Sequence, residues 1–355
     1  MPLFDSGPKV KECEYLLRDV TLRMLANSDS AHWLSTAFVP GYLAGVSTSL
    51  LDRIERREAG LVLYGLSPPK RETAPQELQA IAARQVARLA ALPVDGIIVY
   101  DLQDESERTG EARPFPFLPT VDPSAWACDH LAGATLPKVV YHCTHGDTAA
   151  GFVAWLQRLR AQPAPLAVLV GAPSARARGG LPLDQAYALA RDRAPDVRLG
   201  GIAIAERHAR RHDEHERIRA KDAAGCHFFV TQAVYDVTAT KSLLSDYALA
   251  THDRGESPLP IILTFAPCGS AKTLAFMKWL GIAFPRWLEN DLSRAADPLA
   301  TSIEICAQIF TELWAYARAR GIPLGLNVES VSIRKAEIDA AAELLACLRR
   351  ITLDR

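Results

Sequence analysis

The segment from residue 166 to residue 204 contains the pattern that decides the fold. It opens with the apolar run LAVLVGA (166–172), continues with the amphipathic stretch LDQAYALARDR (183–193) and closes with a second apolar run, LGGIAI (199–204). Both runs are apolar nearly throughout, which is typical of parallel strands that are covered on both faces. The segment therefore predicts two parallel strands joined by a helix.

The same alternation fills the chain from residue 60 to its end. Eight apolar runs are predicted as strands: Gly60–Leu66, Gly96–Leu102, Lys138–Cys143, Leu166–Ala172, Leu199–Ile204, His227–Gln232, Pro260–Phe265 and Pro323–Val328. The stretches with helical spacing are Pro75–Leu92, Thr148–Ala161, Leu183–Arg193, Asp213–Ala224, Thr238–Ala250, Ala271–Gly281, Ala300–Gly321 and Lys335–Leu348. Eight βα units in succession predict an α/β fold, the (β/α)8 TIM barrel, with a doubly wound open sheet as the alternative.

The segments outside this alternation are assigned to an extension and two loops. Residues 1–58 are expected to form an N-terminal helical extension that packs on the barrel end or on a partner, and residues 59–355 form the catalytic barrel domain. Asp104–Ser124, rich in charge and proline, is predicted as a long loop after the second strand. Arg176–Gly180, with the sequence RARGG, is predicted as a flexible loop that could also contact dinucleotide phosphates.

Composition excludes several classes of protein. The 40 Lys and Arg residues are balanced by 41 Asp and Glu residues, and a chain of net charge −1 has no basic surplus for nucleic acid. No apolar run approaches the length of a membrane helix, and the N-terminus lacks the apolar centre of a signal peptide. The seven cysteines are scattered without a Cys-x-x-Cys pair, which predicts a cytoplasmic protein without disulfides or a thiolate metal site.

Polar side chains gather where the predicted strands end. Because the catalytic groups of such barrels lie at the C-terminal ends of the strands, these positions are the candidate site. They carry Ser67, Lys70, Tyr100, Asp101, Glu105, His142, Thr144, Glu206, His208, Thr231, Gln232, Thr264, Asn327 and Glu329. The set includes several titratable groups but no glycine-rich phosphate motif.

Four segments, in chain order, resemble methylenetetrahydrofolate reductases. Leu61–Lys70 is similar to that family's first strand and double-proline turn, and His142 with Thr144 matches its His-x-Thr on the third strand. Gly225–Asp236, GCHFFVTQAVYD, resembles its sixth-strand signature, and Leu259–Leu288 resembles its seventh strand and the following helix. The similarity covers most of the chain and implies the same (β/α)8 barrel.

The resemblance implies an enzyme that reduces 5,10-methylenetetrahydrofolate to 5-methyltetrahydrofolate with NAD(P)H, in most family members through FAD. Gln232 would then hydrogen-bond the pterin ring, since a carboxamide offers a donor and an acceptor side by side. Thr231, Tyr100 and Thr264 would line the same substrate site. The positions that match cofactor contacts are His142, Thr144, Gly171, Ala172 and Lys221.

Three positions depart from the family pattern. Gly65 stands where the family has an acidic residue that assists opening of the imidazolidine ring. Val170 and Ala172 stand where it has the Arg and Asp that contact flavin and folate, so the electrostatic tuning of a flavin would be lost. The pattern resembles the flavin-independent branch of the family, which has Val-Gly-x-Pro at this place (Val170–Pro173 here). It implies that folate and NAD(P)H bind together, with hydride passing directly between them.

Ring opening requires a proton donor even without flavin. Glu329 after the last strand is the first candidate, and Asp101 and Glu105 after the second strand are the next. A carboxyl group at a strand end in an apolar barrel mouth is expected to have a raised pKa, which suits an acid that works near neutral pH.

Two other functions remain open. A folate-binding methyl-transfer enzyme or non-redox pterin-binding protein would keep the barrel and Gln232, and the absence of an acid at Gly65 favours it. A flavin enzyme with unusual contacts is the third hypothesis. Because folate and dinucleotides are both anionic, a near-neutral chain must attract them with a local cluster such as Lys70, Lys221 and the arginine-rich loops.

Some of these residues also have a structural interpretation. His142 could be a satisfied core histidine, Lys221 part of a solvated helix face and Glu329 the cap of the last helix. The run Glu206–Arg219 contains His208, His212 and His215, of which the first two have the spacing of a metal-binding helix. The interleaved Arg and Glu residues favour a charged, solvated helix start instead, and no metal is expected.

Overall fold

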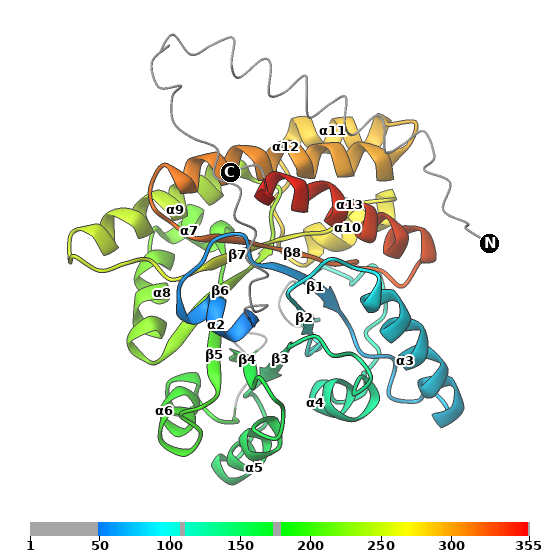
Figure 1. Cartoon of the computed structure of the whole chain (residues 1–355). Coiled ribbons are helices and arrows are strands. Elements are labelled where there is room, and N and C mark those ends of the chain that lie inside the picture. Colours follow the sequence, from blue (N-terminus) through cyan, green and yellow to red (C-terminus); the bar gives the residue numbers. More distant parts are fainter. Residues whose placement is uncertain (1–48, 107–110, 173–178, 354–355) are drawn as a thin grey trace, which may run out of the picture. The chain divides into compact units, whose positions relative to one another are not determined.

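The chain folds into a closed barrel of eight parallel strands in a computed structural model that describes residues 49–106, 111–172 and 179–353. The strands pair in chain order from β1 to β8, and β8 closes the circle on β1 through the pairs Val62↔Leu326 and Tyr64↔Val328. This confirms the predicted (β/α)8 TIM barrel and excludes an open sheet. Figure 1 shows the helices arranged around the strands.

The strands follow the predicted apolar runs. They are β1 (Val62–Leu66), β2 (Gly96–Val99), β3 (Lys138–Cys143), β4 (Leu166–Val170), β5 (Arg198–Ala203), β6 (Cys226–Ala233), β7 (Ile261–Phe265) and β8 (Leu324–Val328). The second strand ends at Val99 rather than at Leu102, whose side chain is exposed. Burial on both faces explains why the runs are apolar throughout.

The helices include the eight that the sequence predicts. The helices in the described residues are α2 (Leu50–Glu55), α3 (Pro75–Ala90), α4 (Pro123–Ala125), the π-helix η1 (Trp126–His130), α5 (Ala149–Leu159), α6 (Leu183–Arg193), α7 (Ala205–Arg211), α8 (Glu214–Ala223), α9 (Val237–His252), α10 (Ala271–Trp279), α11 (Arg286–Arg294), α12 (Pro298–Arg318) and α13 (Lys335–Leu353). The predicted loop Asp104–Ser124 therefore ends where α4 begins, and its residues 107–110 lie outside the described ranges. Within those ranges, no helix combines the length and apolar character needed to cross a membrane.

Short polar side chains fix where several helices begin. Asp236, Ser270 and Asp297 each accept a hydrogen bond from the backbone N–H three residues further on, and so start α9, α10 and α12. Such caps satisfy amide groups that have no partner inside the helix. By fixing where α9 and α10 begin, the caps set the lengths of the loops after β6 and β7. The loop lengths in turn determine which side chains lie at the C-terminal end of the barrel.

Helix α2 closes the N-terminal end of the barrel. It falls within the predicted extension, but Leu50 and Ile54 are part of the barrel core. A Cβ on Gly96, the first residue of β2, would lie 2.6 Å from Leu50 Cδ2, so this close approach requires glycine. Arg53 also forms a salt bridge to Asp95, with 2.6 Å between Nη1 and Oδ2. Residues 1–48 of the predicted extension lie outside the described ranges.

Candidate active site

A hydrogen-bonded polar cluster lies where β7, β8 and β2 end. The fully buried Asn327 of β8 donates through Nδ2 to Tyr100 Oη at 2.8 Å and to Thr264 Oγ1 at 3.2 Å. Tyr100 in turn donates its hydroxyl hydrogen to the carboxylate of Glu329. Tyr100 also packs edge-to-face on the ring of Tyr141, with 4.9 Å between the centroids. The structure therefore brings together four residues that the sequence placed at three separate strand ends.

The carboxyl group of Glu329 is suited to proton transfer near neutral pH. Burial raises the pKa of Glu329 to about 7, against the opposing effect of the hydrogen bond from Tyr100. The side chain is half-buried, and its backbone N–H donates to Phe265 O, which holds the residue at the end of β8. A carboxyl group with such a pKa exists in both protonation states at pH 7, as a general acid must.

The missing side chain of Gly65 makes room for this cluster. A Cβ at this position would lie 2.7 Å from Cε2 of Tyr100 and 3.1 Å from Cβ of Glu329, which is closer than such atoms approach. Pairing of Tyr64 with Val328 places Gly65 and Glu329 side by side on neighbouring strands. Glu329 thus occupies the space next to the position where the resemblance predicts an acid on the first strand.

The two other predicted proton donors differ in their contacts. Asp101 is hydrogen-bonded at both oxygens: Oδ2 accepts from the backbone N–H of Cys143 at 2.8 Å, and Oδ1 accepts from Gln103 at 2.7 Å. Burial raises the pKa of Asp101, while these hydrogen bonds oppose the shift. Its contacts tie the end of β2 to β3. Glu105 is half-buried in the following loop and interacts electrostatically with Arg113.

The predicted pterin contact Gln232 lies at the end of β6 and reaches the end of α10. Its Nε2 donates to Leu280 O at 2.8 Å, and the side chain makes no other hydrogen bond within the described residues. Thr231 is buried beside it and accepts a hydrogen bond from the backbone N–H of Thr264 through Oγ1. Thr231 and Thr264 thus stabilise the pairing of β6 and β7, and Gln232 keeps a free carbonyl group.

Sequence reasoning missed Arg113, which lies at the same end of the barrel. Its guanidinium carbon lies 5.2–5.3 Å from the ring centroids of Phe117, Phe276 and Trp279, a distance suited to cation–π attraction. Nε and Nη1 are buried and have no hydrogen-bond partner within the described residues. The sequence does contain a signal for this arginine site, because aromatic residues alternate with prolines in residues 113–117. Because Trp279 precedes Leu280, Arg113 and Gln232 contact adjacent residues at the end of α10.

The residues that match cofactor contacts are mostly bonded to the protein itself. His142 Nε2 lies 2.6 Å from Asp147 Oδ2, and its ring stacks on Trp155 of α5 at 4.0 Å between centroids. Lys221 donates to Ile202 O at 2.6 Å beneath α8, and burial lowers the pKa of its ammonium group. Lys221 is therefore not on the solvated helix face that the sequence suggested.

The other members of this set offer little to a ligand. Gly171 accepts a hydrogen bond from the thiol of Cys143, and Ala172 is exposed. Thr144 is buried and its Oγ1 has no partner within the described residues. With Val170 and Ala172 apolar, and His142 and Lys221 engaged by the protein, these residues do not fit the contacts of a flavin. Most of the RARGG loop lies in residues 173–178, outside the described ranges.

Comparison with solved structures yields a match that is informative about the family. No family model matches the chain, and no curated protein matches it. Among solved structures, an uncharacterized protein from Clostridium thermocellum is 40% identical over 84% of this chain and 98% of its own, with a TM-score of 0.74. The chain belongs to the family of this protein. That relative binds two copies of 5-methyl-5,6,7,8-tetrahydrofolic acid.

Two other solved structures match the chain at low sequence identity. Tryptophan synthase from M. tuberculosis is 13% identical over 85% of this chain and 96% of its own, with a TM-score of 0.48. A GH113 β-1,4-mannanase is 12% identical over 84% of this chain and 100% of its own, with a TM-score of 0.47. Such values carry no information about function.

Proposed function

We propose that the protein binds a reduced folate at the C-terminal mouth of the barrel and reduces 5,10-methylenetetrahydrofolate to 5-methyltetrahydrofolate with NAD(P)H by direct hydride transfer. The observation that carries the proposal is Glu329, a half-buried carboxyl group with a pKa of about 7 beside Tyr100 and Asn327. The family member from Clostridium thermocellum binds the product of this reaction, which supports a folate as the ligand here.

The chemistry needs one proton and one hydride. The substrate holds its one-carbon unit between N5 and N10, and breaking the bond to N10 leaves an iminium on N5. N10 must gain a proton in the same step, and the protonated form of Glu329 supplies it. NAD(P)H supplies the hydride to the iminium carbon and leaves as NAD(P)+. Glu329 then recovers a proton from solvent, so one folate, one NAD(P)H and one proton are consumed in each turnover.

The neighbours of Glu329 maintain this proton donor. Tyr100 fixes the orientation of the carboxyl group, while Asn327 fixes the Tyr100 hydroxyl from its buried position. Because burial opposes ionisation of Glu329, the acid remains partly protonated at pH 7. The family resemblance assigns this role to an acid on the first strand, and Gly65 leaves the space in which Glu329 takes it over.

Two further side chains are suited to hold the folate. The Leu280 carbonyl orients the Gln232 carboxamide, whose oxygen can accept from a pterin N–H group. Arg113 offers to the carboxylates of the folate glutamate two buried nitrogen atoms that have no hydrogen-bond partner within the described residues. The rings of Phe117, Phe276 and Trp279 hold its guanidinium in place.

One observation favours a second candidate function. The Clostridium thermocellum relative binds two folate molecules, whereas a reductase requires one folate and one dinucleotide. A protein with two folate positions is suited to methyl transfer or to folate binding without redox chemistry. The second function would use Gln232 and Arg113 but would need no hydride donor.

An anaerobic assay separates the two functions. The purified full chain is mixed with 5,10-methylenetetrahydrofolate and NADH or NADPH, with and without added FAD. Oxidation of the nicotinamide and formation of 5-methyltetrahydrofolate without FAD support the reductase. Tight folate binding without oxidation under any condition supports the second function, and failure to bind any reduced folate contradicts both.

The role of Arg113 is tested by comparing ligands with and without the glutamate tail. Arg113→Met should weaken binding of 5-methyltetrahydrofolate and leave binding of a tetrahydropterin without the tail unchanged. Arg320→Met is the matched control, because Arg320 stacks on Tyr316 with 3.5 Å between its guanidinium carbon and the ring centroid. Equal losses for both ligands in Arg113→Met would contradict a tail contact.

A further inference from the structure

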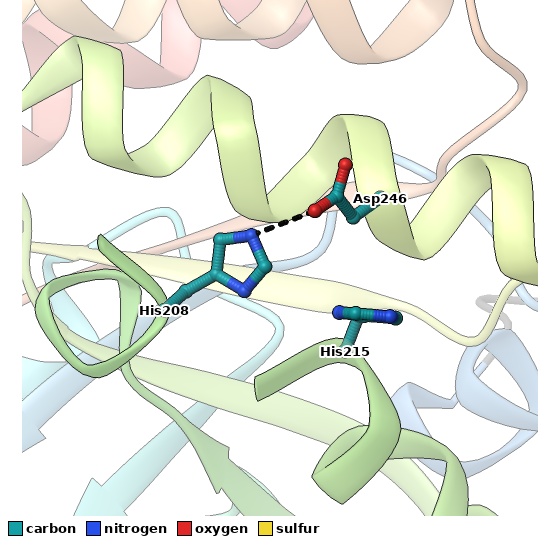
Figure 2. Close-up of side chains that lie close together, drawn as sticks. All are labelled: His208, His215 and Asp246. Atoms are coloured by element: carbon teal, nitrogen blue, oxygen red, sulfur yellow. Dashed lines mark hydrogen bonds and ion pairs between the residues drawn. The ribbon is translucent and has the colours of Figure 1, made fainter. Parts of the chain in front are cut away.

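Three helices on the outside of the barrel each contribute one metal-ligating side chain to a single cluster. His208 lies on α7, His215 on α8 and Asp246 on α9, and Figure 2 shows the three side chains facing a common space. One potential ligand atom from each residue lies within 4.8 Å of the other two. His208 Nε2 is 3.1 Å from Asp246 Oδ2.

The burial of this cluster contradicts the solvated helix start that the sequence suggested. The His208 side chain is 0% exposed, and His215 is 17% exposed. The chain reverses at His212, whose φ of 55° is left-handed, and this turn ends α7 and allows α8 to return beside it. The charged residues do face outward in part, but the reversal turns two of the three histidines inward.

The two histidines retain nitrogen atoms without partners. Nδ1 of His208 and Nδ1 of His215 are both buried, and neither has a hydrogen-bond partner within the described residues. A buried polar atom that lacks a partner carries a free-energy cost, so most such atoms in proteins bind another group or an ion. The hydrogen bond between His208 Nε2 and Asp246 leaves both Nδ1 atoms without a partner, and a cation bound by His208 Nε2, Asp246 and Nδ1 of His215 would give the His215 atom a partner.

We propose that His208, His215 and Asp246 bind one divalent cation of the zinc class. Two imidazole nitrogens and a carboxylate oxygen form a ligand set that zinc accepts in proteins, with the fourth position left for water or another side chain. Ligand atoms around tetrahedral zinc are roughly 3.3 Å apart. The separation of His208 from Asp246 already matches this value, and closing the site requires a movement of His215 toward the other two.

Other polar side chains border the cluster and are candidates for a fourth ligand. His212 has its ring centroid 5.8 Å from that of His208, and Glu216 Oε1 lies 3.5 Å from His215 Nε2.

A bound cation would link all three helices at one point, in addition to the hydrogen bond from His208 to Asp246 and the salt bridge from Arg207 to Glu214. The helices α7 and α8 follow β5, and α9 follows β6. Because the ion binds only the folded arrangement, its binding energy adds to the free energy of unfolding of this part of the barrel. The site is therefore expected to act on stability and not on the proton transfer at Glu329.

The test uses the full chain stripped of metal with a chelator and titrated with Zn²⁺. Calorimetry should show one site per chain, and the melting temperature should rise with Zn²⁺ concentration. His215→Ala should weaken Zn²⁺ binding by about 100-fold or more and remove the rise in melting temperature. This variant is informative because it removes one ligand but leaves the hydrogen bond between His208 and Asp246 in place.

Two further variants keep the proposal falsifiable. Asp246→Asn should also weaken binding, while His252→Ala should bind Zn²⁺ as the wild type does, since His252 is 89% exposed at the end of α9. His208→Ala is avoided because the residue is fully buried and its loss could prevent folding. A wild-type chain that binds no Zn²⁺, or a His215→Ala chain that binds it equally well, overturns the proposal.

Discussion

The two sides of the barrel mouth use their polar side chains differently. On the side of β7, β8, β1 and β2, Glu329 and Tyr100 form a cluster with one another, and a glycine makes space for it. On the side of β3, β4 and β5, His142 and Lys221 bond to neighbouring parts of the protein and pack against helices. The residues of the first side can act on a ligand, and those of the second side mainly stabilise the fold.

This difference shows why position at a strand end does not by itself indicate a catalytic role. A strand-end side chain faces either the barrel axis or the surrounding helices, because successive residues of a strand alternate. Tyr141 belongs to the inward-facing core cluster, whereas its neighbour His142 stacks on Trp155.

Glu329→Gln should lower the turnover rate by about 100- to 10,000-fold, because the proton donor is lost while the shape of the side chain is kept. The affinity for 5-methyltetrahydrofolate should change little, since no bond to N10 is broken in the product. Single-turnover kinetics and calorimetric folate binding measure the two quantities. Full activity in this variant would show that Glu329 is not the proton donor. The two sides of the barrel mouth would then not differ in catalytic role.

Gly65→Ala should lower the free energy of unfolding by about 1–3 kcal/mol, because the new Cβ overlaps the ring of Tyr100. The matched control on the other side is Gly171→Ala, whose Cβ would meet Leu183 at an ordinary 3.9 Å. Urea denaturation of both variants measures the difference. Equal stability of the two variants would show that the space at Gly65 is not needed for the cluster.

Tyr100→Phe should move the pH dependence of turnover. The protonated form of Glu329 is the active form, so the wild-type rate should fall as the pH rises through about 7. The Tyr100 hydroxyl stabilises the charged carboxylate, and its loss raises the pKa of Glu329, so the fall should move to higher pH. Tyr141→Phe should leave the profile in place. A shift of the Tyr100→Phe profile to lower pH would contradict the roles of Glu329 as proton donor and of Tyr100 as its hydrogen-bond partner.

His142→Ala should have the smallest effect on the site. Loss of the contacts with Asp147 and Trp155 is expected to reduce stability by about 1 kcal/mol. Folate affinity and turnover should remain within about twofold of the wild type, since the imidazole packs against α5. Thermal unfolding and folate titration check both values, and a large loss of folate affinity would place His142 among the ligand contacts.

The sequence predicted the barrel well because the strand signal is local. Runs such as 166–172 and 260–265 are apolar on both faces, and their spacing alone implies eight βα units. The short elements α7 and α11 were not predicted, since their few turns are set by tertiary packing and by the left-handed turn at His212.

The sequence predicted the candidate site only in part. It identified Glu329, Gln232 and Tyr100 as strand-end groups, but it could not show that Tyr100 and Asn327 hold Glu329, because residues 100 and 327 are far apart in the chain. It also could not show that Asp246 approaches His208 and His215, or that Arg113 lies between three aromatic rings. Such contacts depend on how distant segments pack, which no local pattern records.

The space at Gly65 has a consequence for how members of this family should be compared with reductases. A position-by-position alignment counts the glycine as the loss of a catalytic acid, because the acid is sought in the same column. In three dimensions the proposed acid, Glu329, lies at the end of the adjacent strand, and the glycine leaves the space beside it open. Related sequences should therefore be sorted by the pair of residues at these two positions, since one acid at either position can serve the same point in space.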